Sequence, residues 1–493
     1  MIIRDPKSRS ISDAVVFCYY GSWATYRPGI AQFNVENINA SLCTHVAYTF
    51  MGLKDGVIVS LDEYNDFEEN WGKGSLKKLS AFAKSSGIKA VLAIGGWNEG
   101  SITYSEVAAT EIGRNKFSDS VVAFAQKFNF DGVDLDWEYP TQRGGSPHDK
   151  ENFSLLLKTL SEKLHAEGLT LTVAVCADPV MAEESYDFEE VARNVDYISL
   201  MAFDYHTASS GKVTGLNSGL HALSSETGDD AKLNAEYSVN QWLDGGVPPS
   251  KLLLGIPLYG RTYILADPEQ HGLGAPTIGN GVSGPYTQEP GFLSYYEICK
   301  ETEWNIVRND QEGYVYAHYD DNWVSYDDIS AVAAKAQFVK DKRLAGIMTW
   351  ALESEDFRNT CGEGANPLLT TANKHSYLLL DRDLEREWLL ERFWGERERP
   401  WSLERDLSFG LLSLDRDLSF GDLSSLDLSL EDLSFGDRSL GERERERLRE
   451  PLRDLERRSL ERERDLERER EYDLNNHQER EHSIRTVTPI ITA

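Results

Sequence analysis

The regular alternation of short apolar segments with amphipathic segments between residues 15 and 366 constrains the fold more than any other feature. The apolar segments are rich in β-branched and aromatic residues and predict eight strands, at 14–20, 43–50, 89–94, 132–136, 170–176, 197–201, 251–256 and 345–350. Helical periodicity lies between most of them, for example at 75–86, 115–128, 150–165 and 233–243. Near-continuous apolar strands separated by helices form parallel sheets that are covered on both faces. The pattern therefore predicts an α/β chain with a (β/α)8 TIM barrel.

Two departures from this alternation divide the chain. The predicted seventh and eighth strands are far apart, and residues 262–336 between them are rich in Gly, Tyr and Pro, with short β-like runs such as 312–319. This segment predicts a small α+β insertion subdomain that forms one wall of a cleft. The barrel is expected to span residues 15–374, after a polar segment at 1–14.

Residues 375–493 form a low-complexity tail rich in Glu, Arg, Asp, Leu and Ser. The tail contains no Lys, Cys or Met, and it repeats Asp-Leu-Ser-Phe-Gly at 406–410, 417–421 and 432–436. Such charged tracts bury too little apolar surface to offset chain entropy, so we expect the tail to be disordered. Alternating Glu-Arg is also what a repeated GA dinucleotide encodes. A translated simple repeat or a faulty gene prediction is therefore the favoured interpretation, and a charged interaction tail is the alternative.

The formal net charge of −31 restricts the partners. Phosphate binding needs clustered Lys and Arg, so the acidity argues against nucleic acid, and a neutral or cationic substrate is easier to reconcile with it. No apolar run is long enough to span a bilayer, so we expect a soluble chain with no membrane partner. We expect it to be a monomer.

The cysteines are Cys18, Cys43, Cys176, Cys299 and Cys361, and none of them forms a CxxC pair. This spacing argues against a zinc ribbon, and we predict no metal site. In a barrel Cys18 and Cys43 would lie close together, and Cys299 and Cys361 both fall late in the folded region. We predict disulfides Cys18–Cys43 and Cys299–Cys361, with Cys176 free; five reduced cysteines are the alternative. Residues 1–14 lack the apolar region of a signal peptide, so the chain is either intracellular or does not begin at the native precursor start.

Three carboxyl groups recur at alternate positions in Phe130-Asp-Gly-Val-Asp-Leu-Asp-Trp-Glu-Tyr-Pro140. On a strand Asp134, Asp136 and Glu138 point to one face, and Leu135 and Trp137 point to the other. In a barrel the three carboxyls would stack in the lumen at its C-terminal end, where barrel enzymes carry out catalysis. Crowded carboxylates cannot all ionise cheaply, so at least one pKa must rise, which supplies a protonated acid at neutral pH. The solvated face of an edge strand and a hard-cation site are the alternatives.

This segment resembles the DGxDxDWEYP signature of family 18 chitinases. Other segments resemble that family in the same order along the chain: Cys43-Thr-His-Val-Ala-Tyr48, Leu92-Ala-Ile-Gly-Gly-Trp97, Gly255-Ile-Pro-Leu-Tyr-Gly-Arg261 and Gly346-Ile-Met-Thr-Trp350. The resemblance covers residues 15–366, is greatest to animal chitinases of the arthropod type, and does not extend into the tail. It implies a chitinase that hydrolyses β-1,4-linked N-acetylglucosamine polymers without a cofactor. Together with the cysteines it implies a secreted, extracellular protein.

The resemblance also implies substrate-assisted retaining catalysis. Glu138 would protonate the glycosidic oxygen while the sugar's own N-acetyl oxygen attacks the anomeric carbon. Asp136 would orient the acetamido group, Asp134 would lie beneath it and share a proton, and Asp131 would shape the entry of the strand. The implied aromatic platforms are Trp350 under the scissile sugar and Trp23 and Trp97 on the glycone side. Other implied cleft residues are Tyr19, Phe50, Tyr139, Met201, Asp204, Tyr259 and Arg261.

One departure bears on activity, because Phe203 stands where the family's MxYD segment has a tyrosine. That hydroxyl normally donates to the acetamido oxygen, so its loss predicts reduced activity. Tyr205 is expected to face the same way as Phe203 but deeper in the loop, without replacing it. Segment 206–209 lacks the family's glycine and tryptophan, which predicts a missing aglycone-side platform. Two other functions stay open: a non-hydrolytic chitin-binding lectin on the same barrel, and an endo-N-acetylglucosaminidase acting on glycoprotein glycans.

Overall fold

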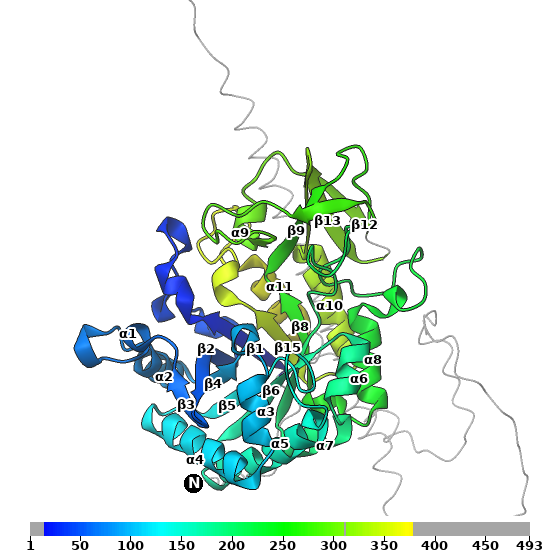
Figure 1. Cartoon of the computed structure of the whole chain (residues 1–493). Coiled ribbons are helices and arrows are strands. Elements are labelled where there is room, and N and C mark those ends of the chain that lie inside the picture. Colours follow the sequence, from blue (N-terminus) through cyan, green and yellow to red (C-terminus); the bar gives the residue numbers. More distant parts are fainter. Residues whose placement is uncertain (1–13, 310–311, 378–493) are drawn as a thin grey trace, which may run out of the picture. The chain divides into compact units, whose positions relative to one another are not determined.

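A computed structural model describes residues 14–309 and 312–377, and within these residues eight parallel strands close into a barrel (Figure 1). Neighbouring strands pair in the order β1-β15-β8-β7-β6-β5-β4-β2, and pairing of β1 with β2 closes the ring. Their bounds are Val15–Gly21 (β1), His45–Lys54 (β2), Lys89–Gly95 (β4), Gly132–Asp136 (β5), Thr170–Cys176 (β6), Tyr197–Met201 (β7), Leu252–Pro257 (β8) and Gly346–Trp350 (β15). The short strand β3 (Val57–Ser60) forms an antiparallel hairpin with β2. The predicted (β/α)8 barrel is confirmed.

Apart from β5, which carries Asp134 and Asp136, the barrel strands are mainly apolar because both of their faces are buried, each against different surroundings. On β1, Phe17 and Tyr19 belong to a cluster that fills the barrel interior together with Ala93 and Met348. The alternate residues of β1, such as Val16, Cys18 and Tyr20, belong to the larger cluster between strands and helices. Burial on both faces explains why these strands lack the polar alternation of a half-exposed sheet.

Most of the helices surround the barrel (Figure 1), and four of the longer ones overlap the helices predicted at 75–86, 115–128, 150–165 and 233–243. Their bounds are Ser75–Ser86 (α2), Glu111–Lys127 (α4), Asp149–Ala166 (α5), Ala235–Asp244 (α8), Ile329–Asp341 (α10) and Pro367–Tyr377 (α11). Short helices lie at Glu63–Asp66 (α1), Ile102–Ala108 (α3), Pro179–Ser185 (α6), Phe188–Asn194 (α7) and Tyr295–Ile298 (α9). Helix α4 begins four residues before the predicted position 115, because the Thr110 hydroxyl accepts from the Gly113 amide and caps a polar first turn.

The insertion between β8 and β15 is a six-stranded antiparallel sheet with the main order β10-β9-β14-β13-β12, in which β11 pairs with β9. Its strands are Tyr259–Leu265 (β9), Thr277–Asn280 (β10), Phe292–Ser294 (β11), Asn305–Asn309 (β12), Tyr314–Tyr319 (β13) and Asn322–Tyr326 (β14). The sheet ends at Tyr326, ten residues before the expected boundary at 336. Residues 329–341 instead form α10, which packs on β8 and β15 as a barrel helix. The expected boundary fell inside this helix because its Ala-rich sequence carries a weak periodic signal.

The two predicted disulfides are present, and the alternative of five reduced cysteines is wrong. Cys18 is bonded to Cys43 with a Cα–Cα distance of 6.0 Å, and Cys299 is bonded to Cys361 with 5.8 Å between the Cα atoms. Cys176 is free and buried, as predicted. None of the described helices combines the length and apolar character that a bilayer crossing requires. Apart from Ala14, the predicted N-terminal segment lies outside the described residues, as does the tail beyond Tyr377.

Candidate active site

Strand β5 carries a column of carboxyl groups, as its alternation predicted. Asp134 and Asp136 are buried on the inner face of the barrel, and Glu138 follows at the C-terminal rim, where it is half-buried. Leu135 and Trp137 belong instead to the cluster beneath the helices, and the Trp137 indole N–H donates to the Ser101 hydroxyl at 3.0 Å. Alternate strand positions therefore separate acid side chains from packing side chains. The edge-strand alternative is excluded by this burial.

Asp134 lies deepest in the column, and each of its carboxylate oxygens accepts a hydrogen bond from a side chain of another barrel strand. The Tyr19 hydroxyl on β1 donates to one carboxylate oxygen at 2.6 Å, and the Thr172 hydroxyl on β6 donates to the other at 2.5 Å. Burial raises the pKa of Asp134 to about 6, although both hydrogen bonds act in the opposite direction. Two hydrogen bonds therefore fix the Asp134 carboxylate, and its pKa of about 6 lies just below neutral pH.

Asp136 and Glu138 both have raised pKa values. Burial, followed by the neighbouring Glu138 and Asp134, raises the pKa of Asp136 well above its usual range. Its Oδ1 atom has no hydrogen-bond partner within the described part of the chain, so it is available to an incoming group. Burial also raises the pKa of Glu138 to about 7, which is opposed by Tyr139 and Arg143 and reinforced by Asp204. The column therefore retains a proton at neutral pH, as general acid catalysis requires.

Aromatic rings form a floor beside this column. The Trp350 ring, at the end of β15, lies 5.4 Å from the Tyr19 ring, 5.8 Å from the Phe50 ring and 6.2 Å from the Trp23 ring, measured between centroids. The Phe50 ring is stacked on both Trp350 and Trp23. Trp23 is 42% exposed, so its face is open to solvent. Two of the three predicted platform residues, Trp23 and Trp350, are thus brought together with the predicted cleft residues Tyr19 and Phe50.

Trp97 lies apart from this floor, on the turn that follows β4. It is 58% exposed, and the Arg143 guanidinium lies 3.7 Å from its ring centroid. Arg143 also donates to the Trp97 carbonyl at 2.6 Å and to the Glu138 carbonyl at 3.1 Å. Arg143 therefore connects a candidate sugar platform to the candidate acid.

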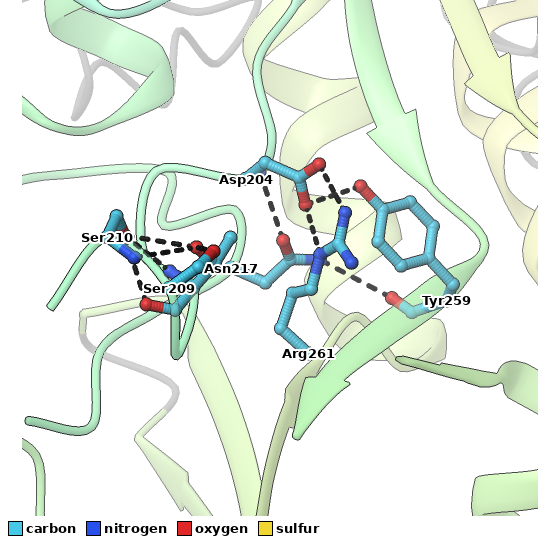
Figure 2. Close-up of polar contacts among 7 residues, drawn as sticks. Asp204, Ser209, Ser210, Asn217, Tyr259 and Arg261 are labelled. Carbon is cyan, nitrogen blue, oxygen red and sulfur yellow. Dashed lines mark hydrogen bonds and ion pairs between the residues drawn. The ribbon is translucent and has the colours of Figure 1, made fainter. Parts of the chain in front are cut away.

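A second polar cluster surrounds Asp204, after β7. The Arg261 guanidinium donates to both carboxylate oxygens of Asp204 at 2.6 Å, and the Tyr259 hydroxyl donates to one of them at 2.7 Å. Figure 2 shows both side chains pointing at this carboxylate, while Asn217 lies on the side of the Asp204 backbone. Residues from the barrel and from β9 of the insertion thus meet at this carboxylate, and the role of the insertion as a cleft wall stays a prediction.

Phe203 packs with the residues of the barrel interior, next to Met201. Its ring lies edge-on to the Tyr259 ring, 6.0 Å away between centroids. Tyr205 was expected to face the same way as Phe203, and this expectation is wrong. It is buried in the outer cluster, and its hydroxyl lies 2.8 Å from the Ser238 hydroxyl on α8. Tyr205 therefore cannot supply a hydroxyl at the position of Phe203.

The sequence pattern did not predict two residues that lie near the carboxyl column, Thr172 and Arg143. Thr172 could have been found, because the alternation on β6 turns it into the barrel beside Asp134. Arg143 could not, because it lies in an irregular loop with a positive φ of 51°.

Asp131 behaves as predicted: it accepts from the Ala90 amide at 3.0 Å and from the Lys89 ammonium at 2.8 Å, at the entry of the strand. His206 contacts the Leu216 carbonyl at 3.2 Å, which indicates packing.

One group of side chains in the described residues has the spacing of a metal site, namely Cys299, Asp356 and Cys361. The two sulfur atoms are bonded to each other as a disulfide. The Asp356 carboxylate accepts from the amides of Thr360 and Cys361 at 2.7 and 2.8 Å. These ligand atoms are already used within the protein, so the group does not fit a metal ion.

A (β/α)8 barrel with buried carboxyls at its C-terminal end, a retained proton among them and a floor of aromatic rings has the architecture of a glycoside hydrolase. The family described as "Glycosyl hydrolases family 18" matches residues 15–356. The chain belongs to this family.

Individual relatives agree with this assignment. The chain is 41% identical over 367 residues to "Probable chitinase 2" of Drosophila melanogaster, which covers 71% of this chain and 74% of that protein. It is similar to the crystal structure of Ostrinia furnacalis Group IV chitinase in complex with allosamidin, with 40% identity, a TM-score of 0.71, and coverage of 73% of this chain and 98% of the other. It is also similar to human YKL-39, described as a pseudo-chitinase with retained chitooligosaccharide binding properties, with 31% identity, a TM-score of 0.68, and coverage of 74% and 99%.

Proposed function

We propose that the protein is a chitinase that hydrolyses β-1,4-linked N-acetylglucosamine polymers by substrate-assisted retaining catalysis. The observation that carries the proposal is the carboxyl column of β5, with Glu138 at the rim and the Trp350 floor beside it. Family membership and relatives named as chitinases support the same substrate.

In the proposed reaction the Glu138 carboxyl donates its proton to the glycosidic oxygen as the bond to the leaving sugar breaks. The carbonyl oxygen of the substrate's own acetamido group forms a bond to the anomeric carbon, giving a cyclic cation. A water molecule then attacks the same carbon from the side that the leaving sugar had occupied, the bond to the acetamido oxygen breaks, and the water gives a proton to Glu138. The two successive inversions at the anomeric carbon leave its configuration retained. A pKa of about 7 suits a group that must first give and then take a proton.

Asp136 would stabilise the cyclic cation, because its unpartnered Oδ1 can accept from the acetamido N–H. Asp134, with Tyr19 and Thr172 as donors, would hold Asp136 in place and take part in sharing the proton. The Asp204 cluster and the aromatic floor would bind the flanking sugars, since pyranose C–H faces pack on rings and hydroxyls bond to carboxylates.

Further exposed aromatic rings lie at Tyr26, Tyr64 and Trp71, and we propose that they bind a longer polymer. Tyr26 and Tyr64 are each 54% exposed, and the Lys73 ammonium lies 4.3 and 5.9 Å from their ring centroids. Trp71, in the same loop as Lys73, is 96% exposed. Further exposed aromatic rings of this kind support a polymeric substrate rather than a small sugar.

A non-hydrolytic chitin-binding role is the second candidate, because Phe203 leaves the acetamido oxygen without the expected donor. The similarity to human YKL-39 supports it, since that protein is described as a pseudo-chitinase. Retention of Glu138 with a raised pKa favours hydrolysis. For either function we propose an oxidising compartment such as the cell exterior, because the two disulfides persist only under oxidising conditions.

Turnover of a soluble chito-oligosaccharide by the wild type and by Glu138→Gln tests the proposal. We expect hydrolysis by the wild type and none by the variant, because the amide keeps the shape of the side chain but has no acidic proton. Oligosaccharide binding should be retained in the variant. Binding without turnover in the wild type would establish the lectin role, and equal turnover in both proteins would remove Glu138 from its assigned role.

A further inference from the structure

The loop 202–205 that follows β7 is held by a second, buried loop at 214–218. The Ser218 hydroxyl donates to the Ala202 carbonyl at 2.5 Å. The Asn217 side-chain oxygen accepts from the Asp204 amide at 3.0 Å, and the Asn217 carbonyl accepts from the Tyr205 amide at 3.2 Å. Asn217 is fully buried and Ser218 nearly so. Two successive residues therefore bind three backbone groups of the loop that carries Phe203 and Asp204.

These two residues are in turn anchored to the insertion sheet. The Asn217 amide donates to the Ser325 hydroxyl on β14 at 2.9 Å, and its side-chain nitrogen lies 3.5 Å from the Tyr259 carbonyl on β9. The Lys335 ammonium on α10 donates to the Ser218 hydroxyl at 2.5 Å. Lys335 also forms a buried ion pair with Asp327, directly after β14. The sheet and the loop are thus joined by buried hydrogen bonds rather than by apolar contact alone.

The loop needs such support because its backbone is strained. Asp204 has a positive φ of 60°, which a residue with a side chain adopts at a cost unless its surroundings hold it. The Ala202 peptide joins Met201 and Phe203, which both pack into the barrel interior. A small displacement of this backbone would move the Phe203 ring and the Asp204 carboxylate together.

We propose that Asn217 and Ser218 are positioning residues that transmit the placement of the insertion sheet to the substrate-binding loop 202–205. The inference rests on the proposed function of the cleft that this loop lines. The side chains act through Ala202, Asp204 and Tyr205 without touching the reacting atoms. The insertion then does more than form a wall: it sets the geometry in which the acetamido group is received.

Ser218 gives the clearest test, because removal of Lys335 would leave the buried Asp327 carboxylate unpaired and would destabilise the whole fold. Ser105 on α3 is a matched control. Ser105 is also buried, and its hydroxyl donates to the Asp149 carboxylate at 2.8 Å and accepts from the Ser146 amide at 3.2 Å. Ser218→Ala and Ser105→Ala therefore remove the same chemistry from two different places.

Kinetics on a soluble chito-oligosaccharide should separate the two variants. We expect kcat to fall about tenfold in Ser218→Ala, since misplacement of a positioned group mainly affects the transition state. The conservative variant Ser218→Thr, which restores a hydroxyl, should recover most of this loss. Ser105→Ala should keep the wild-type kcat, even if its melting temperature falls as much as that of Ser218→Ala. Equal kcat values for the two alanine variants would overturn the inference.

Amide hydrogen exchange gives a readout that does not depend on turnover. The amides of Asp204 and Tyr205 should exchange about tenfold faster in Ser218→Ala than in the wild type and Ser105→Ala, because their loop is released. If the wild type does not hydrolyse the substrate, the proposed function fails and this exchange rate alone decides the inference. Unchanged exchange in Ser218→Ala would then overturn it, and faster exchange would support it.

Discussion

Restoring a hydroxyl at position 203 tests how the barrel receives the acetamido group. Phe203 is half-buried among residues of the barrel interior, close to Met201 and Tyr259. In this low-dielectric setting a phenol hydroxyl aimed at the acetamido oxygen would strengthen its hydrogen bond as charge develops during attack. We therefore expect Phe203→Tyr to raise kcat while KM changes little.

The size of the gain follows from the burial of Phe203. A hydrogen bond to a group that becomes charged contributes about 1.5–3 kcal/mol, which corresponds to a rate increase of about 10- to 150-fold. Initial rates on one soluble chito-oligosaccharide at several pH values would measure the gain. The matched control is Tyr205→Phe, which deletes a hydroxyl two residues away on the outer face, next to Ser238. It should lower stability by about 1 kcal/mol and leave kcat unchanged.

The two variants together give a sharp decision. An active wild type whose kcat is unmoved or lowered by Phe203→Tyr would refute the role assigned to this position. The same conclusion would follow if Tyr205→Phe reduced kcat as strongly as Phe203→Tyr raised it. An inactive wild type that is rescued by the new tyrosine would assign the natural chain to the non-hydrolytic class.

Three further predictions concern charge and covalent structure. Arg143→Met removes a positive charge that lowers the pKa of Glu138, so the alkaline limb of kcat/KM, expected near pH 7, should move to higher pH; an unmoved limb would exclude this coupling. Replacement of both Cys18 and Cys43 by Ala opens a loop with a sequence separation of 25 and should cost about 3.5 kcal/mol in chemical denaturation. A loss of unfolding free energy smaller than about a third of this value would contradict the prediction. Burial raises the pKa of Glu355 to about 8, so the folded state binds this proton more tightly than the unfolded state. Its contribution to stability is present below about pH 4.5 and is lost as pH rises through 8. Glu355→Gln should flatten the dependence of the unfolding free energy on pH over this range, and an unchanged slope would contradict it.

The parts of the fold that follow a period were predictable. Strands β5, β6 and β7 have the predicted bounds, because alternating burial and turn residues act locally. The same alternation turned Asp134, Asp136 and Glu138 into the barrel. It also turned Tyr19 into the barrel interior, and Trp350 lies at the end of β15.

Where the period stops, the prediction stops as well. After Met201 the backbone makes two tight turns, with the Ala202 amide bonded to the Leu200 carbonyl and the Phe203 amide bonded to the Met201 carbonyl, each at 2.8 Å. The side-chain alternation of a strand does not continue through these turns, which is why Tyr205 lies on the outer face.

Contacts between distant segments were also out of reach. Asn217 and Ser218 lie in a loop without periodicity, and Lys335 is separated from Ser218 by 117 positions in the chain. Only the folded structure brings them together. The sequence carries no local signal that a lysine on a barrel helix contacts a serine behind the cleft.

The pairing of β1 with β15 has a consequence for how the chain folds. Val15 lies opposite Gly346, so the barrel can close only after the last strand, β15, pairs with the first strand, β1. Contacts of such sequence separation slow folding, because loop entropy must be lost before they form. During synthesis β1 and β8 would each expose an unpaired edge until β15 leaves the ribosome, and such edges promote association between chains. A nascent barrel of this kind therefore has its greatest risk of aggregation just before β15 emerges from the ribosome, which makes late translation the stage at which a chaperone would act.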